Sequence, residues 1–306
     1  MGTSGKLALE AKFLWVPTAD RIRLLDRFIA SLGSSKLTDS RTAGLNPRLR
    51  IDLSTWCLLH QQMSSTVIHS NQVRRFDRLD ALRGAAVVWM AGFHFCFDLN
   101  HLGFIKQNFY LDPFWTLQRT CIVTLFLFCA GLGQAVAVQQ GQTWTRFWRR
   151  WSQVASCAVL VTAGSILMFP KSFISFGVLH GIALMLIITR CTGSWGRWLW
   201  LAGSVALLLP SLIQHSFFDT RWSNWVGLIT RKPVTEDYVP LLPWLGVMWW
   251  GMAAGQWSLL HAPAVLKGRV PKLLQPLALL GRWSLSFYMV HQPVFIGALM
   301  VATALR

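Results

Sequence analysis

Ionisable side chains interrupt several apolar runs of this chain, and they are the residues best suited to chemistry. They are Arg83, His94, Asp98, Arg119, His180 and His291. A charged side chain at the centre of a bilayer costs about 3 kcal/mol on insertion scales, so such residues usually have a function. An imidazole exchanges protons near neutral pH, and a guanidinium binds anions. The pattern therefore indicates proton transfer or anion binding inside a membrane protein.

Three of these residues share one face of the apolar run 82–99. Arg83 and His94 are eleven residues apart, about three helical turns, so they point the same way at different depths. His94 and Asp98 are i and i+4 neighbours, which predicts a general base with an orienting carboxylate. Asp80 and Arg83 are i and i+3 neighbours and are expected to pair at the other end. The alternative is that these polar groups only join helices of a bundle.

A second polar stripe lies in the run 281–293. Ser284, Tyr288 and His291 follow i, i+4, i+7 spacing and share a helical face. Pro293 frees a backbone carbonyl one turn earlier, which predicts a kink. Irregular backbone at that depth must be buried in protein or hydrated, so this face is expected to line a cavity. We predict a catalytic role for His291 and a substrate-binding role for Tyr288.

Three further residues are predicted to bind substrate: Arg119, His180 and Asp237. His180 lies between Gly177 and Gly181, which allow a backbone or a ligand to come close, although helix packing explains such a histidine as well. Arg119 requires a carboxylate or an anionic ligand. The nearest candidate carboxylates are Asp98, Asp112 and Asp237.

The surrounding sequence is that of a membrane protein, with 53% hydrophobic and only 13% charged residues. Seven apolar runs approach the ~20 residues that cross a hydrocarbon core, which predicts an all-α polytopic transmembrane helix bundle. The runs are 82–99, 114–137, 152–169, 172–190, 196–213, 240–260 and 278–303, with a tight turn at 169–171 between the third and fourth.

Basic residues are distributed unequally between the ends of these runs. One side carries Arg74, Arg75, Arg78, Arg83, Arg146, Arg149, Arg150, Arg190, Arg197, Lys267, Arg269, Lys272 and Arg282, and the other Lys106, Lys171, Arg221, Arg231, Lys232 and Arg306. The positive-inside rule therefore predicts a cytoplasmic N-terminus and an external 214–239 loop. The same rule accounts for the net charge of +17, so no nucleic-acid partner is expected.

The chain is predicted to divide near residue 70. Residues 1–70 contain no run long enough to span a bilayer and are expected to be a poorly ordered N-terminal extension of the transmembrane domain at 71–306. A native start at Met63 is one hypothesis for this extension. The six cysteines lack metal-finger spacing, so no metal site is expected. Nucleotide-binding, zincin and serine-hydrolase motifs are missing.

Six ordered segments carry a more specific signal: 78–84 (RLDALRG), 93–99 (FHFCFDL), 125–131 (LFLFCAG), 173–180 (FISFGVLH), 237–244 (DYVPLLPW) and 281–293 (GRWSLSFYMVHQP). Together they resemble the bacterial branch of the heparan-alpha-glucosaminide N-acetyltransferase catalytic domain family, over about Arg75 to Arg306. The resemblance implies a multi-helix acyltransferase that takes acetyl groups from cytoplasmic acetyl-CoA. It implies a multi-pass protein of the bacterial inner membrane. The family's histidine near the far face would correspond to His94 or His101 here.

Such a reaction fits the residues. The CoA phosphates require cations at the cytoplasmic ends, and the candidates are Arg83, Arg149, Arg150 and Arg282. Attack on the thioester requires a base near the outer face, with His94, Asp98 and His291 as the predicted catalytic residues. A covalent acetyl-imidazole is a second possibility. The acceptor would be an envelope glycan or a small amine.

Two other functions compete with acyl transfer. The first is a transporter or flippase whose intramembrane His and Arg residues bind an anionic solute or lipid-linked sugar, and the second is a structural membrane subunit. For the arginines at the cytoplasmic ends, the positive-inside rule alone is a sufficient alternative explanation.

Overall fold

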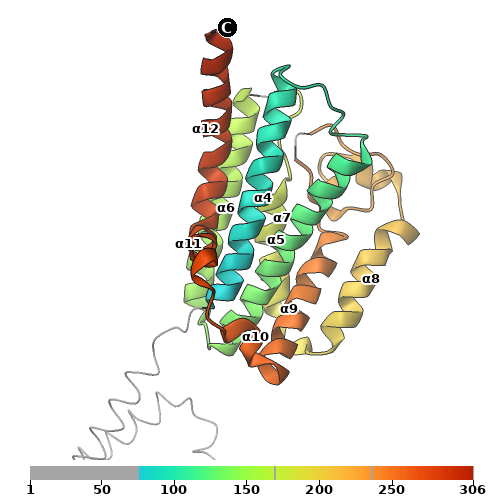
Figure 1. The fold of residues 1–306 in the computed structure, drawn as a ribbon. Helices are drawn as coiled ribbons and strands as arrows, with labels where there is room; N and C mark the ends of the chain where they lie inside the picture. Colours follow the sequence, from blue (N-terminus) through green and yellow to red (C-terminus); the bar gives the residue numbers. More distant parts are fainter. Residues whose placement is uncertain (1–75, 169, 236, 306) are drawn as a thin grey trace, which may run out of the picture. The chain divides into compact units, whose positions relative to one another are not determined.

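The computed structural model of this protein describes residues 76–168, 170–235 and 237–305. The predictions for residues 1–70 lie outside these ranges. Within them every regular element is a helix, which confirms the all-α fold class (Figure 1). The long helices are α4 (Asp77–His101), α5 (Pro113–Gln139), α6 (Trp144–Met168), α7 (Val178–Cys191), α8 (Trp198–Leu212), α9 (Trp244–His261) and α12 (Ser284–Ala304).

Shorter helices complete the described part of the chain. They are η2 (Gly193–Trp195), η3 (Ser216–Asp219), η4 (Asn224–Val226), α10 (Pro263–Lys267), η5 (Lys272–Leu274) and α11 (Gln275–Arg282). Helices α5, α6 and α12 are long and apolar enough to cross a membrane, whereas α7 and α8 are apolar but shorter. The number of spans and their sidedness therefore stay predictions.

Consecutive long helices run in opposite directions (Figure 1). The start of α4 and the connections α5–α6, α7–α8 and α9–α12 lie at one end, shown at the bottom of the figure. The connections α4–α5, α6–α7 and α8–α9 lie at the other end, with the C-terminal end of α12. Residues far apart in sequence are thus collected at the same two ends of the bundle.

Three predicted spans differ most from the observed helices. The third was expected from residue 152, but α6 begins at Trp144. The fourth was expected from residue 172, but α7 begins at Val178, so the connection after α6 extends beyond the predicted turn. Gly177 has an extended backbone and Asp237 caps the new helix start, which explains the shift. The seventh, expected as one helix over 278–303, is divided into α11 and α12 because the backbone of Trp283 leaves helical geometry.

Helices α5 and α9 form the centre of the bundle through close backbone contact. A Cβ atom on Gly131 would lie 2.1 Å from the Met248 carbonyl oxygen, and one on Gly251 would lie 2.3 Å from that of Phe128. Small residues allow this approach, which is how helices pack inside membranes. The side chains of Met248 and Met252 are fully buried beside this contact.

Helix α11 packs on α4 through the same kind of close backbone contact. A Cβ atom on Gly84 would lie 1.9 Å from the Leu277 carbonyl oxygen, and one on Gly281 would lie 1.8 Å from that of Asp80. Any larger side chain would force the two backbones apart. The contact places Arg282, the residue after Gly281, beside the first turns of α4.

Candidate active site

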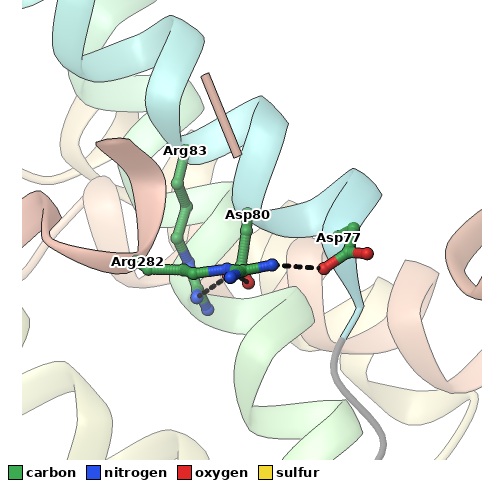
Figure 2. A network of polar contacts seen from close by, with 4 residues as sticks. All are labelled: Asp77, Asp80, Arg83 and Arg282. Carbon is green, nitrogen blue, oxygen red and sulfur yellow. Dashed lines mark hydrogen bonds and ion pairs between the residues drawn. The ribbon is translucent and has the colours of Figure 1, made fainter. Parts of the chain in front are cut away.

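Four charged residues form a chain of contacts where α11 meets the start of α4 (Figure 2). We call Asp77, Asp80, Arg83 and Arg282 the charged cluster. Arg282 Nη2 donates to Asp77 Oδ1 at 2.8 Å, and its Nε lies 3.6 Å from Asp80 Oδ2. Arg83 Nη1 lies 3.3 Å from Asp80 Oδ1, which confirms the predicted i, i+3 pair. Asp80 is thus shared by the two arginines, and Arg282 also binds Asp77.

The charged cluster accounts for two of the four arginines predicted to bind CoA. Their side chains are partly exposed, 29% for Arg83 and 35% for Arg282. Each arginine forms an ion pair with an aspartate of α4. The Arg83 guanidinium also lies against Gly133 of α5. In the structure, Arg83 and Arg282 therefore join α4, α5 and α11.

The other two arginines, Arg149 and Arg150, are exposed on the first turns of α6. Phe147 is buried and the Trp151 indole donates to the Ala183 carbonyl oxygen at 2.8 Å, so the opposite face of the helix packs on α7. The sequence holds no acidic residue between Asp112 and Asp219. The two guanidinium groups therefore have no carboxylate on their own or adjacent helices α5 to α8.

The predicted catalytic residues come together between α4 and α12. We call His94, Asp98, His291 and Gln292 the imidazole cluster. The His94 and His291 rings face each other edge to face, with 5.2 Å between their centroids. One turn further along α4, Asp98 Oδ1 accepts a hydrogen bond of 2.8 Å from Gln292 Nε2. Two side-chain contacts thus join the same two helices.

The surroundings of His291 determine which of its nitrogens is available. Its Nδ1 lies 2.8 Å from the Tyr288 carbonyl oxygen and 3.3 Å from that of Phe287. A carbonyl only accepts, so Nδ1 must carry the hydrogen, and in the neutral ring Nε2 keeps its lone pair. That Nε2 is buried with no hydrogen-bond partner among the described residues. A fixed imidazole with a free acceptor nitrogen has the geometry of a general base.

Asp98 is the second buried group with unused acceptor capacity. Its residue exposure is 5%, close to the 6% of His291, and its Oδ2 has no partner in the described part of the chain. The sequence predicted a direct His94–Asp98 pair, but the hydrogen bond seen at Asp98 comes from Gln292. His94 instead packs on the ring of His291.

Aromatic rings surround the imidazole cluster. Phe287 stacks on His291 at 5.8 Å and 7°, Phe295 meets the same ring edge-on at 5.9 Å, and Phe93 contacts His94. Hydrogen bonds and charges act more strongly in such an apolar environment than in water. The cost of leaving the buried acceptors unpaired rises for the same reason.

His180 and Asp237 cap the start of α7. The Gly177 N–H donates to His180 Nδ1 at 3.3 Å, and the His180 Nε2 lies 3.1 Å from the Thr162 hydroxyl of α6. The Val178 N–H donates to Asp237 Oδ2 at 2.7 Å. Both residues predicted to bind substrate thus satisfy backbone donors at a helix N-terminus.

Arg119 and Tyr288 extend this region toward the imidazole cluster. Burial raises the pKa of Asp237, while the Val178 N–H bond and the positive charge of Arg119 oppose the rise. Tyr288 lies within electrostatic reach of Asp237, and its ring centroid is 5.7 Å from that of His291. Asp112 caps α5 by accepting from the Phe114 N–H, which leaves Asp237 as the carboxylate near Arg119.

The described residues also contain an apolar groove of about 360 Å³ on α4 and α5. It is lined by Trp89, Cys121, Thr124, Leu125 and Phe128, none of them a predicted site residue. Among residues 76–168, 170–235 and 237–305, no group of three His, Cys, Asp or Glu side chains is placed to hold a metal ion.

The helical fold and the contact between the buried His291 and the partly buried His94 identify a membrane protein with a histidine site. Residues 75–293 match the family described as Heparan-alpha-glucosaminide N-acetyltransferase, catalytic. The match covers more than two thirds of the chain and includes both the charged cluster and the imidazole cluster. The chain belongs to this family of membrane acetyltransferases. No curated protein and no solved structure matches it.

Proposed function

We propose that the protein transfers an acetyl group from cytoplasmic acetyl-CoA to an amine or hydroxyl of an envelope glycan or a small acceptor. The observation that carries the proposal is the pair of facing imidazoles, His94 and His291, in a chain of this acetyltransferase family. The protein would work as a multi-pass protein of the bacterial inner membrane, with the start of α4 toward the cytoplasm.

The imidazole cluster supplies the proton transfer of this reaction. The acceptor nitrogen or oxygen attacks the thioester carbonyl carbon while His291 Nε2 takes its proton. The new N–C or O–C bond replaces the C–S bond, and the imidazolium returns the proton to the departing CoA thiolate. His94 is the second imidazole within reach of that proton, and Asp98 stabilises the transient positive charge.

The donor phosphates are assigned to Arg149 and Arg150, because these guanidinium groups are exposed and lack an acidic neighbour on α5 to α8. Charge-assisted hydrogen bonds to phosphate are among the strongest that a protein makes. Arg83 and Arg282 support this end from within the charged cluster. On the acceptor side, Arg119, His180, Asp237 and Tyr288 form the proposed binding region.

The experiment is acetyl transfer by purified protein in proteoliposomes, with isotopically labelled acetyl-CoA and mass spectrometry of envelope glycans. Wild-type protein is expected to label an acceptor and to be stabilised thermally by CoA, since a ligand of the folded state raises its stability. His94→Ala should lose transfer and keep stabilisation by CoA.

Two other results would change the proposal. Solute movement across the vesicle wall without loss of label from acetyl-CoA would identify a transporter and overturn the proposal. Full activity of His94→Ala would show that His94 is not needed, and that His291 alone or His101 carries out the proton transfer.

A further inference from the structure

We infer that Gln292 is a positioning residue of the acetyl transfer, which orients Asp98 and presents its own carbonyl oxygen to the acceptor. The inference rests on the proposed function. Gln292 lies within the conspicuous 281–293 segment, yet residue types and spacing gave it no role. The structure places it in direct contact with a buried carboxyl group of another helix.

The contact has one consistent orientation. The amide nitrogen Nε2 donates to Asp98 Oδ1 at 2.8 Å. If the amide were turned, its oxygen would face the carboxylate oxygen, and two acceptors would meet without a hydrogen between them. Gln292 follows His291 directly on α12. The same helix turn therefore positions the His291 imidazole and, through the Gln292 amide, the Asp98 carboxyl group.

Three acceptor atoms of the imidazole cluster have no donor in the described part of the chain. Asp98 Oδ2, Gln292 Oε1 and His291 Nε2 are all buried and have no hydrogen-bond partner among the described residues. Buried acceptors that lack a donor cost free energy, so a native structure rarely keeps them without a ligand or a function. The missing partners are donors, which the attacking group of an acceptor molecule carries.

Gln292 therefore has two connected functions. It holds Asp98 so that Oδ2 stays directed away from the amide, and it supplies a second acceptor oxygen to the substrate. Fixing a reacting group in its productive geometry mainly affects the chemical step. A change of Gln292 should thus lower kcat, with little effect on the KM for acetyl-CoA, whose phosphates are assigned to Arg149 and Arg150 at the opposite end of the bundle.

The test compares Gln292→Leu, Gln292→Glu and a control in one reconstituted preparation. The control is Gln118→Leu, because the Gln118 side chain also makes a hydrogen bond to α4, from the Trp89 indole. Gln292→Leu removes the donor to Asp98 at similar size, so kcat should fall about tenfold to a hundredfold. The control should keep the wild-type kcat, and both proteins should keep a similar Tm.

The Gln292→Glu variant adds a readout that packing alone would not give. When protonated, the introduced carboxyl donates an O–H to Asp98 Oδ1 in place of the amide. When ionised, it repels Asp98. The titratable groups around this position are His94 and His101 on α4 and His291 and Tyr288 on α12. The activity of this variant relative to wild type should therefore be near normal at low pH and fall as the pH rises.

Three results would overturn the inference: a Gln292→Leu kcat within twofold of wild type, a loss that only follows the folded fraction, or a pH-independent ratio for Gln292→Glu. These are distinct from failure of the proposed function. In that case the wild-type protein itself would leave acetyl-CoA unconsumed with every acceptor tried, and no comparison of variants would arise.

Discussion

The two polar clusters along α4 use their charges in opposite ways. In the charged cluster, every aspartate has an arginine partner and the side chains stay partly exposed, 44% for Asp77. In the imidazole cluster, Asp98 and His291 are almost fully buried, yet each keeps an atom without a hydrogen-bond partner among the described residues. One region is satisfied within the chain, and the other keeps buried acceptors where we propose that the acceptor molecule binds.

This contrast separates structural charges from functional ones in a membrane bundle. Unusual depth alone does not distinguish them, because Arg83 and His94 both interrupt the same apolar run. Partner satisfaction does distinguish them. Paired, half-exposed ions contribute about 0.2–1 kcal/mol each, whereas a buried acceptor without a donor costs about 1–3 kcal/mol. A fold keeps the second kind when another molecule completes it.

The largest expected effect is on the imidazole cluster. His291→Ala removes the nitrogen that takes the acceptor proton, so kcat for acetyl transfer should fall about 10²- to 10⁴-fold. The matched control is His261→Ala, because His261 is exposed at the end of α9 and contacts Trp257, one turn earlier on the same helix. An equal loss in both variants would contradict a special role for His291.

The next effect concerns the two exposed arginines at the start of α6. Arg149→Gln and Arg150→Gln should each raise the KM for acetyl-CoA about tenfold to a hundredfold. This is the loss of affinity expected when one charge-assisted hydrogen bond to phosphate is removed. The steady-state KM, measured with orientation checked by protease accessibility, tests this. Unchanged KM in both variants would leave these residues as topological signals only.

The third effect is structural and sharpens the contrast from the other side. Gly281→Leu forces a side chain into the Asp80 backbone, so it should separate α11 from α4 and cost about 1–3 kcal/mol or more of stability. Gly297→Leu is the control, because nothing lies within 4 Å of a Cβ atom there. Thermal unfolding in detergent measures both. Equal Tm values would show that the close contact does not hold the charged cluster in place.

The smallest effect is expected in the 214–239 loop, at an exposed but satisfied carboxylate. Hydrogen bonds from the Thr230 hydroxyl and the Thr230 and Arg231 N–H groups lower the pKa of Asp219 below its ordinary 3.8. The folded pKa is depressed, so this contribution is present above pH 3.8 and is lost as the pH falls through the folded value. Protection of the Thr230 amide from hydrogen exchange, measured relative to its intrinsic rate at each pH, should fall at low pH in the wild type. An equal pH dependence in Asp219→Asn would contradict this.

Local spacing predicted one of two expected contacts within α4 and missed the contacts between helices. The Asp80–Arg83 pair follows from i, i+3 geometry and is observed. The ion pair between Arg282 and Asp77 joins residues 205 positions apart. It forms because Gly84 and Gly281 allow the backbones of α4 and α11 to come close. Polar interruptions identified His94, Asp98 and His291, but the partner of Asp98 turned out to be Gln292, whose only sequence signal is an amide beside a histidine in an apolar run.

Helix boundaries show the same limit. Apolar length located all seven long helices, yet it placed the start of α7 six residues early, because an extended Gly177 and a cap from Asp237, 59 residues away, define where that helix begins. Hydropathy records which residues prefer lipid. It does not record where backbone donors find their partners.

The most direct test of this account is the ratio of kcat values for His291→Ala and Arg282→Gln, measured in the same proteoliposomes at equal amounts of folded protein. Arg282→Gln breaks a pair in the charged cluster and should lose at most about 1 kcal/mol of stability with a nearly normal kcat. His291→Ala should keep its stability and lose chemistry, so the ratio is predicted to be about 0.01 or lower. A ratio near one would contradict the division between a structural and a chemical end of α4.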